Sequence, residues 1–201
     1  MRILGDNEVG GFSMLNQIRN RAASSGPQTA ASLLLGCHDR IRHFTGVAVN
    51  LAHAHAAEPG QISRAADAVY RYFSISLPLH EADENLSLHP RLHRALGTAA
   101  PDEHSTLRQL AGPAADAMLE QHESIDQLVE RMLPLLTILR NNPAALPDVA
   151  NELCEITSAL KQMFDGHLKL EEETVFPAME KYLSPEELAG LVAEMQARRK
   201  N

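Results

Sequence analysis

Four histidines recur at nearly even intervals along this 201-residue chain. They are separated by 42, 42 and 45 residues, and they are His38, His80, His122 and His167. Two of the four are followed by a glutamate at the fourth position along, Glu84 in one case and Glu171 in the other. Neutral imidazole nitrogens and carboxylate oxygens are ligands of divalent iron, manganese and zinc. The residue types therefore predict a metal site.

The step of four residues says how such a site would be built. On an α-helix, residues i and i+4 share one face, with their Cβ atoms about 5–6 Å apart. A histidine can then hold one metal while the glutamate one turn on reaches across to a second. Two such pairs and two further histidines supply four nitrogens and two bridging carboxylates, a set by which helical bundles hold two divalent metals. This set suits iron or manganese, and zinc is a further candidate.

The alternative is a structural polar layer without metal. Such a layer would leave charged and polar groups unpaired in the core, which is costly. The even spacing, with one histidine on each expected helix, favours the metal site.

The elements that must position these residues are long helices. Alanine, leucine and glutamate are abundant, and helical periodicity predicts helices over about 29–57, 62–95, 105 or 113–140, and 147–182. Pro78 should kink the second helix or open its backbone ladder. The short connections predict an all-α, antiparallel up-down four-helix bundle over residues 28–183. Residues 1–27 are expected to form a leader that is in part disordered, and residues 184–201 a short C-terminal helix and tail, with Ser184 as N-cap.

The sequence also contains an internal repeat. Both His-x-x-x-Glu pairs are followed by a proline ten residues after the histidine, Pro90 and Pro177. The other two histidines begin two similar segments, His38-Asp-Arg-Ile41 and His122-Glu-Ser-Ile125. The first two helices and the last two therefore read as two copies of one hairpin, which brings the four histidines to one level.

Composition excludes several classes of protein. The net charge is −8 and the pI about 5.7, which argues against nucleic acid as a partner. We expect the only basic cluster, residues 198–200, to complement a helix C-terminus and not a ligand. The two cysteines form no disulfide framework, and no run of residues suits a signal peptide or a membrane span. The expectation is a reduced, cytoplasmic protein without a membrane partner, and a homodimer is left open.

The segments HLKLEEETVFP (167–177) and LPLHEADENLSLHP (77–90) resemble the hemerythrin-like family, whose members carry an HHE cation-binding domain. The resemblance spans about residues 30–180 and implies a non-haem di-iron centre. One iron would take His38 and His80, the other His122 and His167, with both glutamates bridging.

One position departs from the oxygen-carrying members of this family, which have a fifth histidine one turn after the third-helix histidine. Asp126 occupies that place. The four-His, two-Glu set is more similar to the di-iron proteins that repair iron–sulfur clusters. Asp126 is a candidate additional ligand, an acceptor for an imidazole N–H, or a salt-bridge residue. As a ligand it would leave open positions on the His38/His80 iron.

The resemblance implies a small diatomic ligand, O2 or NO, bound for sensing, storage or redox defence. The alternative is a di-iron enzyme or repair factor that acts on NO, peroxide or damaged iron–sulfur clusters. A metal store or structural module is a third interpretation, and the sequence leaves open whether the protein is catalytic.

Overall fold

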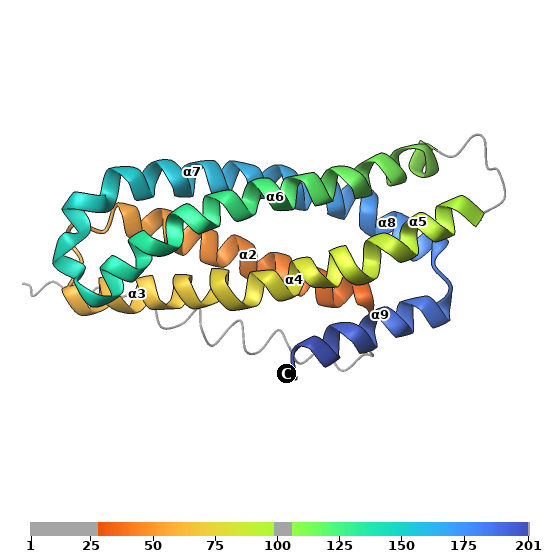
Figure 1. Ribbon diagram of the computed structural model, residues 1–201, viewed down its shortest axis with the longest axis horizontal. Helices are drawn as coiled ribbons and strands as arrows, with labels where there is room; N and C mark the ends of the chain where they lie inside the picture. Colours follow the sequence, from red (N-terminus) through yellow and green to blue (C-terminus); the bar gives the residue numbers. More distant parts are fainter. Residues whose placement is uncertain (1–27, 99–105, 201) are drawn as a thin grey trace, which may run out of the picture.

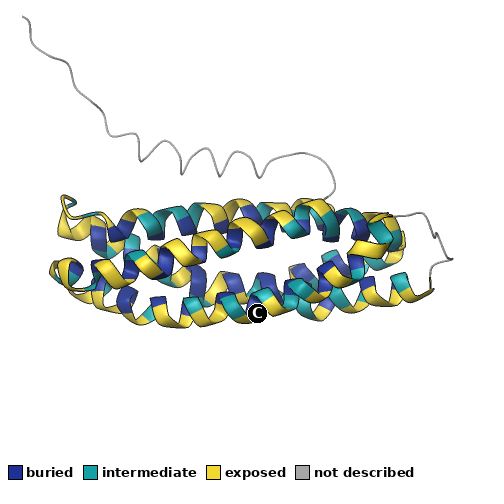
Figure 2. Cartoon of the chain, turned by 90° about the horizontal axis from the view of Figure 1, so that it is seen from above, coloured by how far each residue is buried: buried dark blue, intermediate teal, exposed yellow. Residues whose placement is uncertain are grey.

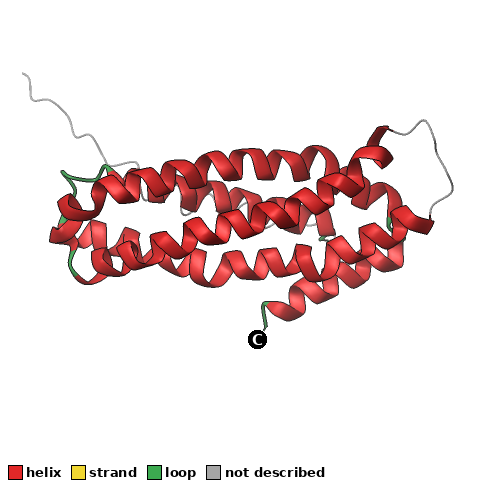
Figure 3. Cartoon of the chain, turned by 45° about the horizontal axis from the view of Figure 1, so that its top comes forward, coloured by secondary structure: helices red, strands yellow, loops and turns green. Residues whose placement is uncertain are grey.

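A computed structural model describes residues 28–98 and 106–200, and every regular element in these two ranges is helical (Figure 3). The predicted leader, residues 1–27, lies outside the described residues. No helix of the described part is long and apolar enough to cross a membrane.

Four helical rods run side by side along the length of the molecule (Figure 1). The first, second, third and fourth rods contact one another in a closed ring, so consecutive rods are neighbours. This is the predicted up-down four-helix bundle, and the expected all-α fold is confirmed. The rods are α2 (Ala30–Ala52); α3 (Pro59–Arg71), α4 (Leu77–Asp83) and α5 (His89–Thr98); α6 (Thr106–Asn141); and α7 (Leu146–Leu170) with α8 (Phe176–Tyr182).

The rods begin and end close to the expected places, with one clear difference. The first helix ends at Ala52 and the second begins at Pro59, whereas we expected residues 57 and 62. Pro59 and Gly60 therefore start a helix and do not merely end one. Proline suits the first helical turn because its missing N–H would have no partner there. A short 3-10 turn, η3 (Pro143–Ala145), joins α6 to α7.

Three π turns interrupt the second and fourth rods, and each ends two residues before a proline. In each case the residue just before the proline donates its N–H to the carbonyl five residues back. The wider turn accommodates a proline inside a rod, because the ring would otherwise clash with the carbonyl four residues back. Pro113 and Pro134 lie within α6 without a π turn, so proline alone does not produce one. The turns are η1 (Tyr72–Ser76), η2 (Glu84–Leu88) and η4 (Glu171–Val175), before Pro78, Pro90 and Pro177.

The apolar core consists of two clusters, one toward each end of the bundle. Buried residues line the inner faces of the rods (Figure 2). The first cluster ends at residues such as Ile41 and Leu77, and the second begins at residues such as Leu34 and Leu88. The predicted metal-binding residues lie between the two clusters, so the bundle has a buried polar layer with an apolar core on each side.

A fifth helix, α9 (Pro185–Arg198), folds back along α2, α4 and η2 (Figure 1). Its predicted N-cap is confirmed, since the Ser184 side chain accepts from the Glu187 N–H. Its C-terminal arginines form ion pairs that we did not expect. Arg198 and Arg199 donate to the fully buried carboxylate of Asp83 at 2.9 and 2.6 Å. Arg199 also donates to the carbonyl of Met195, as expected at a helix end. The C-terminal helix is therefore docked against the helix that carries His80.

Candidate metal centre

The six predicted four-His, two-Glu residues come together in the buried layer. Each is at most 3% exposed. The helix middles supply the imidazoles, whereas each glutamate is the first residue of a π turn. The rods thus contribute His38 from α2, His80 and Glu84 from α4 and η2, His122 from α6, and His167 and Glu171 from α7 and η4.

Each glutamate lies between two imidazoles from different rods. Glu84 places Oε1 at 3.5 Å from Nε2 of His80 and Oε2 at 3.3 Å from Nε2 of His122. Glu171 places Oε2 at 3.0 Å from Nε2 of His38 and Oε1 at 3.2 Å from Nε2 of His167. Each carboxylate therefore lies between two groups of ligand atoms, one around His38 and His80 and the other around His122 and His167.

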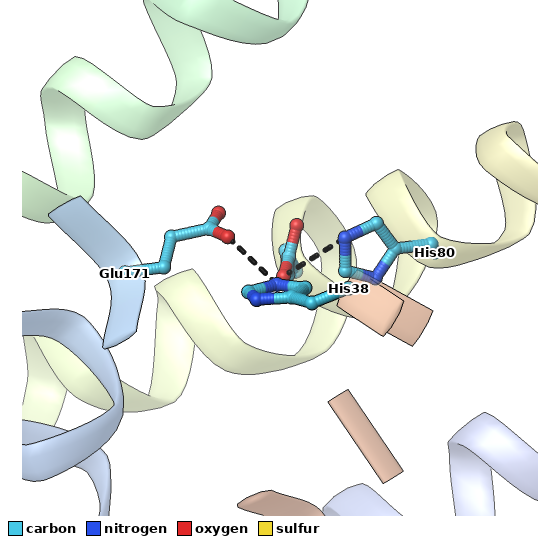
Figure 4. Close-up of side chains that lie close together, drawn as sticks. His38, His80 and Glu171 are labelled. Atoms are coloured by element: carbon cyan, nitrogen blue, oxygen red, sulfur yellow. Dashed lines mark ion pairs between the residues drawn. The ribbon is translucent and has the colours of Figure 1, made fainter. Parts of the chain in front are cut away.

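The two groups are alike in composition. In one group His38 and His80 meet both glutamates, and their rings lie edge to face with centroids 5.3 Å apart (Figure 4). In the other, His122 and His167 meet the same two glutamates, with their Nε2 atoms 3.2 Å apart. Metal–ligand bonds of about 2.0–2.2 Å place neighbouring ligand atoms about 3 Å apart. The observed separations match that spacing.

The hydrogen bonding of the layer also fits metal ions. Within the described residues, nine buried side-chain nitrogen and oxygen atoms lack a hydrogen-bond partner. Seven of them belong to this layer: all four glutamate oxygens, Nε2 of His38, and both ring nitrogens of His80. Buried polar atoms are normally paired, so this concentration calls for a missing partner. Two divalent cations would compensate the two carboxylates and use the lone pairs of these atoms, except Nδ1 of His80, since an imidazole in this layer offers one nitrogen to a metal.

Burial sets the protonation of the metal-free layer. It lowers the pKa of His80 well below its usual value, that of His122 to about 4 and that of His167 to about 3. Burial raises the pKa of Glu171 to about 8 and that of Glu84 well above its ordinary range. Burial thus holds the imidazoles of His80, His122 and His167 neutral, the form that binds metal, whereas the carboxyls must lose protons before they can bind.

Comparison with family models matches residues 113–200 to the hemerythrin HHE cation-binding domain. These residues are similar to that domain. The match covers α6 from Pro113 onward together with α7, α8 and α9, and it indicates a metal-binding protein, typically of iron. The hairpin that carries His38, His80 and Glu84 lies outside the matched residues, and its place in the centre rests on the geometry above. No curated protein and no solved structure matched the chain.

Three of the four imidazoles of this layer have an outer hydrogen-bond partner, which lies at Nδ1. Nδ1 of His38 lies 2.7 Å from Glu172, which also accepts from Arg42. Nδ1 of His122 lies 2.8 Å from Oδ1 of Asn85, and Nδ1 of His167 lies 2.9 Å from Oε1 of Gln121. Such contacts fix the ring orientation and leave Nε2 free for a metal. Each partner directly neighbours a layer residue in sequence.

Asp126 is not brought into either group. Its side chain is exposed, and its carboxyl shares a hydrogen bond with Glu81, whose pKa burial and this contact raise to about 8. The predicted acceptor role toward His122 is taken by Asn85. Four residues advance a helix by about 400°, so residue 126 lies about 40° round α6 from His122. On α6 this rotation brings Asp126 to the solvent-exposed face, whereas after His80 and His167 the same step brings Glu84 and Glu171 into the core.

Aromatic rings close the layer toward the core. Phe176 lies with its centroid 5.0 Å from that of His38, and Phe164 lies 6.4 Å from His167. Phe73 packs on Phe164 at 6.2 Å in the core, as expected. Sequence reasoning missed Phe176, Asn85 and Gln121. The signal that could have found the two amides is their place beside a predicted ligand.

A separate surface cluster involves two histidines outside the buried layer. His89 and His93 stand one turn apart on α5, and their Nε2 atoms lie 3.0 and 2.8 Å from Oδ1 of Asp116 on α6. His53 and His55 are exposed, and His104 lies outside the described residues.

Proposed function

We propose that the protein holds two non-haem iron ions in the buried layer and that this centre binds O2 or NO. Each iron would take two imidazoles, and both would share the two carboxylates. The observation that carries the proposal is the position of these carboxylates. Both are fully buried, both lie between the two groups, and none of their four oxygens has a hydrogen-bond partner. The ligands would be His38 and His80 for one iron, His122 and His167 for the other, with Glu84 and Glu171 in common.

The donor set leaves room for a small ligand. Each group offers four ligand atoms, two nitrogens and two carboxylate oxygens. A metal ion that prefers six ligands then keeps positions that the protein does not fill. When bound, a di-iron pair supplies a redox centre at those positions. The chain itself favours the neutral form of three imidazoles by burial, orients three through Nδ1, and shields the layer from water with Phe164 and Phe176.

The exposed position of Asp126 bears on the choice of role. Because Asp126 is not a ligand in this arrangement, neither iron would have an additional anionic ligand, and both would have the same set of protein ligands. A second candidate is therefore a di-iron enzyme or repair factor for NO, peroxide or damaged iron–sulfur clusters. The observation that favours it is the four-His, two-Glu donor set without a fifth histidine.

Anaerobic reconstitution tests the proposal. Chelator-treated protein is loaded with Fe(II) under nitrogen, freed of excess metal and analysed for iron. It is then exposed to O2 or NO while optical and Mössbauer spectra are recorded. We expect two irons per chain and spectra that change with both gases. Two bound irons whose spectra respond to neither gas would overturn the proposal that the centre binds O2 or NO. Consumption of NO or peroxide over many turnovers would favour the enzyme. Loading with Mn(II) and Zn(II) in parallel tests the preference for iron.

A further inference from the structure

The outer hydrogen bonds follow the internal repeat, with one exception. The repeat relates His38 to His122 and His80 to His167. The outer partner of His38 follows Glu171 in sequence, and that of His122 follows Glu84, so these two contacts are equivalent. The partner of His167 is Gln121, the residue before His122. The equivalent partner for His80 would be the residue before His38.

That residue is Cys37, and it does not play the part of Gln121. Its Sγ atom accepts from Arg40 at 3.0 Å and lies 3.6 Å from a nitrogen of Arg199. Nδ1 of His80 is left buried without a hydrogen-bond partner among the described residues. The broken repeat thus coincides with an unpaired imidazole nitrogen.

A cavity of about 300 Å³ lies at this place, between α2, the η1–α4 segment and the end of α9. Its wall includes Cys37 and His80 but none of the other five residues of the buried layer. His80 belongs to the cavity wall, and since its Nε2 faces Glu84, the buried and unpaired Nδ1 is the ring nitrogen left for a group on the cavity side. Since a water molecule takes about 30 Å³ of liquid, the space holds a small ion together with several waters.

The cavity wall is rich in donors and contains no carboxylate. The lining residues include Arg40, Arg199, Tyr72 and Ser76, whose side chains carry guanidinium and hydroxyl donors. Arg199 already pairs with Asp83, but Arg40 pairs with no carboxylate in the described ranges and donates to the Cys37 sulfur. Donors that converge without an acceptor favour an anion.

We propose that this cavity binds a small oxyanion, which accepts from Nδ1 of His80 and from Arg40. The anion takes the place that the amide of Gln121 holds on the opposite side of the layer. The chain alone forms the cavity, so anion binding and iron binding can fail independently of each other.

The test is calorimetric titration of the full-length, metal-free protein in a chloride buffer with inorganic phosphate and, separately, with acetate. We expect saturable binding of at least one anion at one site per chain. A preference for phosphate identifies a phosphate-bearing ligand, and a preference for acetate identifies a carboxylate. Saturable binding of neither anion would overturn the proposal. Iron content, measured on the same preparation after reloading, reports on the proposed function separately.

Three variants sharpen the result. Cys37→Gln restores the internal partner and fills the space, so it should abolish binding. Arg40→Gln should weaken binding by about 10-fold or more, because hydrogen bonds to charged groups contribute about 1.5–3 kcal/mol. Arg131→Gln removes an equal charge from the surface of α6, outside the cavity, and should change affinity by less than about twofold. Unchanged binding in Cys37→Gln, or equal losses in the Arg40 and Arg131 variants, would contradict the site. Arg40 and Arg131 are both exposed, so their variants should fold.

A second inference rests on the surface cluster alone. The two imidazoles of His89 and His93 and the carboxylate of Asp116 converge within 3.0 Å of one oxygen. Their ligand atoms lie close enough together to surround one ion. We infer that the cluster binds one divalent transition metal such as Zn²⁺ or Ni²⁺, with water in the remaining positions. The ion would tie α5 to α6 at the end of the bundle.

Equilibrium dialysis against Zn²⁺ tests this inference. The double variant His89→Ala/His93→Ala should bind one zinc ion fewer per chain than the parent. The matched control His53→Ala/His55→Ala should bind as many as the parent, because those exposed histidines belong to no group of metal-binding residues within 28–98 and 106–200. Glu171→Ala disrupts the buried layer and should still bind one ion at the surface. Equal zinc content in the parent and the first double variant would overturn the site.

Discussion

The two halves of the buried layer agree on their inner side and differ on their outer side. His38 and His80 meet the same two carboxylates as His122 and His167, at similar distances. Outside, the second pair is held by two neutral amides. The first pair has a charged partner on one ring and, on the other, a cavity lined by arginines. The internal repeat thus keeps the atoms that would touch metal, whereas the atoms behind them have diverged.

This difference suggests a division of roles. Amide partners fix ring orientation without adding charge, so both rings of the His122/His167 half are held by the chain itself. In the His38/His80 half, Nδ1 of His80 has no such partner among the described residues, and we propose an exogenous anion there. Variants that remove a glutamate shared by both halves should have the largest effects on metal binding. Variants that change a contact in one half should have smaller effects.

Loss of either shared carboxylate should remove both metals. Glu84→Ala or Glu171→Ala takes one ligand from each group, so iron content should fall from two per chain to near zero. The thermal midpoint of the iron-grown protein should fall by about 10 °C, since tight binding adds about 4 kcal/mol and about 1 kcal/mol corresponds to about 2–4 °C at this size. Elemental analysis and calorimetry measure both quantities. Glu173→Ala, an exposed neighbour, is the control, and an unchanged iron content in either test variant would refute the bridging role.

Loss of an amide partner should affect one half only. Gln121→Leu removes the acceptor of the His167 ring and should lower the affinity of one metal by about 10–100-fold. Release to a chelator should then become biphasic, with one metal lost early. Cys37→Gln gives His80 an equivalent partner and should slow release from the other half. Equal acceleration of both phases by Gln121→Leu would show that the halves do not act separately.

The dependence of stability on pH should differ between metal-free and loaded protein. Glu171 has a pKa near 8 in the folded metal-free chain, above its ordinary value of 4.5, so its contribution is full below pH 4.5 and is lost as pH rises through about 8. Between pH 7 and 8 this loss should lower the thermal midpoint of the metal-free protein by a few degrees. Loaded protein should show no such fall, because metal already holds the carboxylate unprotonated. Thermal melts across this range test the difference, and parallel curves would count against it.

The smallest expected effect is that of Asp126→Ala. Because this side chain is exposed and contacts Glu81, its removal should leave iron content unchanged and metal affinity within about twofold. Competition with a chelator measures the affinity. Loss of one iron would instead restore Asp126 as a ligand.

Much of the fold could be predicted, because the apolar periodicity and the helix stops are local signals. The even spacing of His38, His80, His122 and His167 was sufficient to place them at one level, since consecutive rods run antiparallel. The same reasoning failed for Asp126. Helical spacing gives the relative direction of two side chains on one rod, but the rotation of the rod is set by packing against its neighbours.

The outer contacts could not be predicted for a related reason. Each of the three outer partners comes from a different rod than its imidazole, and whether the two atoms meet depends on the length of the partner's side chain. Cys37 and Gln121 are equivalent in sequence, yet one leaves a cavity and the other fills it. The π turns at Glu84 and Glu171 were also missed, although the prolines that follow them were recognised as part of the repeat.

The most direct test of the account is the position of the metals. Crystals of iron-loaded protein, measured on both sides of the iron absorption edge, should give two anomalous peaks per chain. One should lie against His38 and His80, the other against His122 and His167, and both should contact Glu84 and Glu171. A single peak, or two peaks that do not share both glutamates, would contradict the central claim.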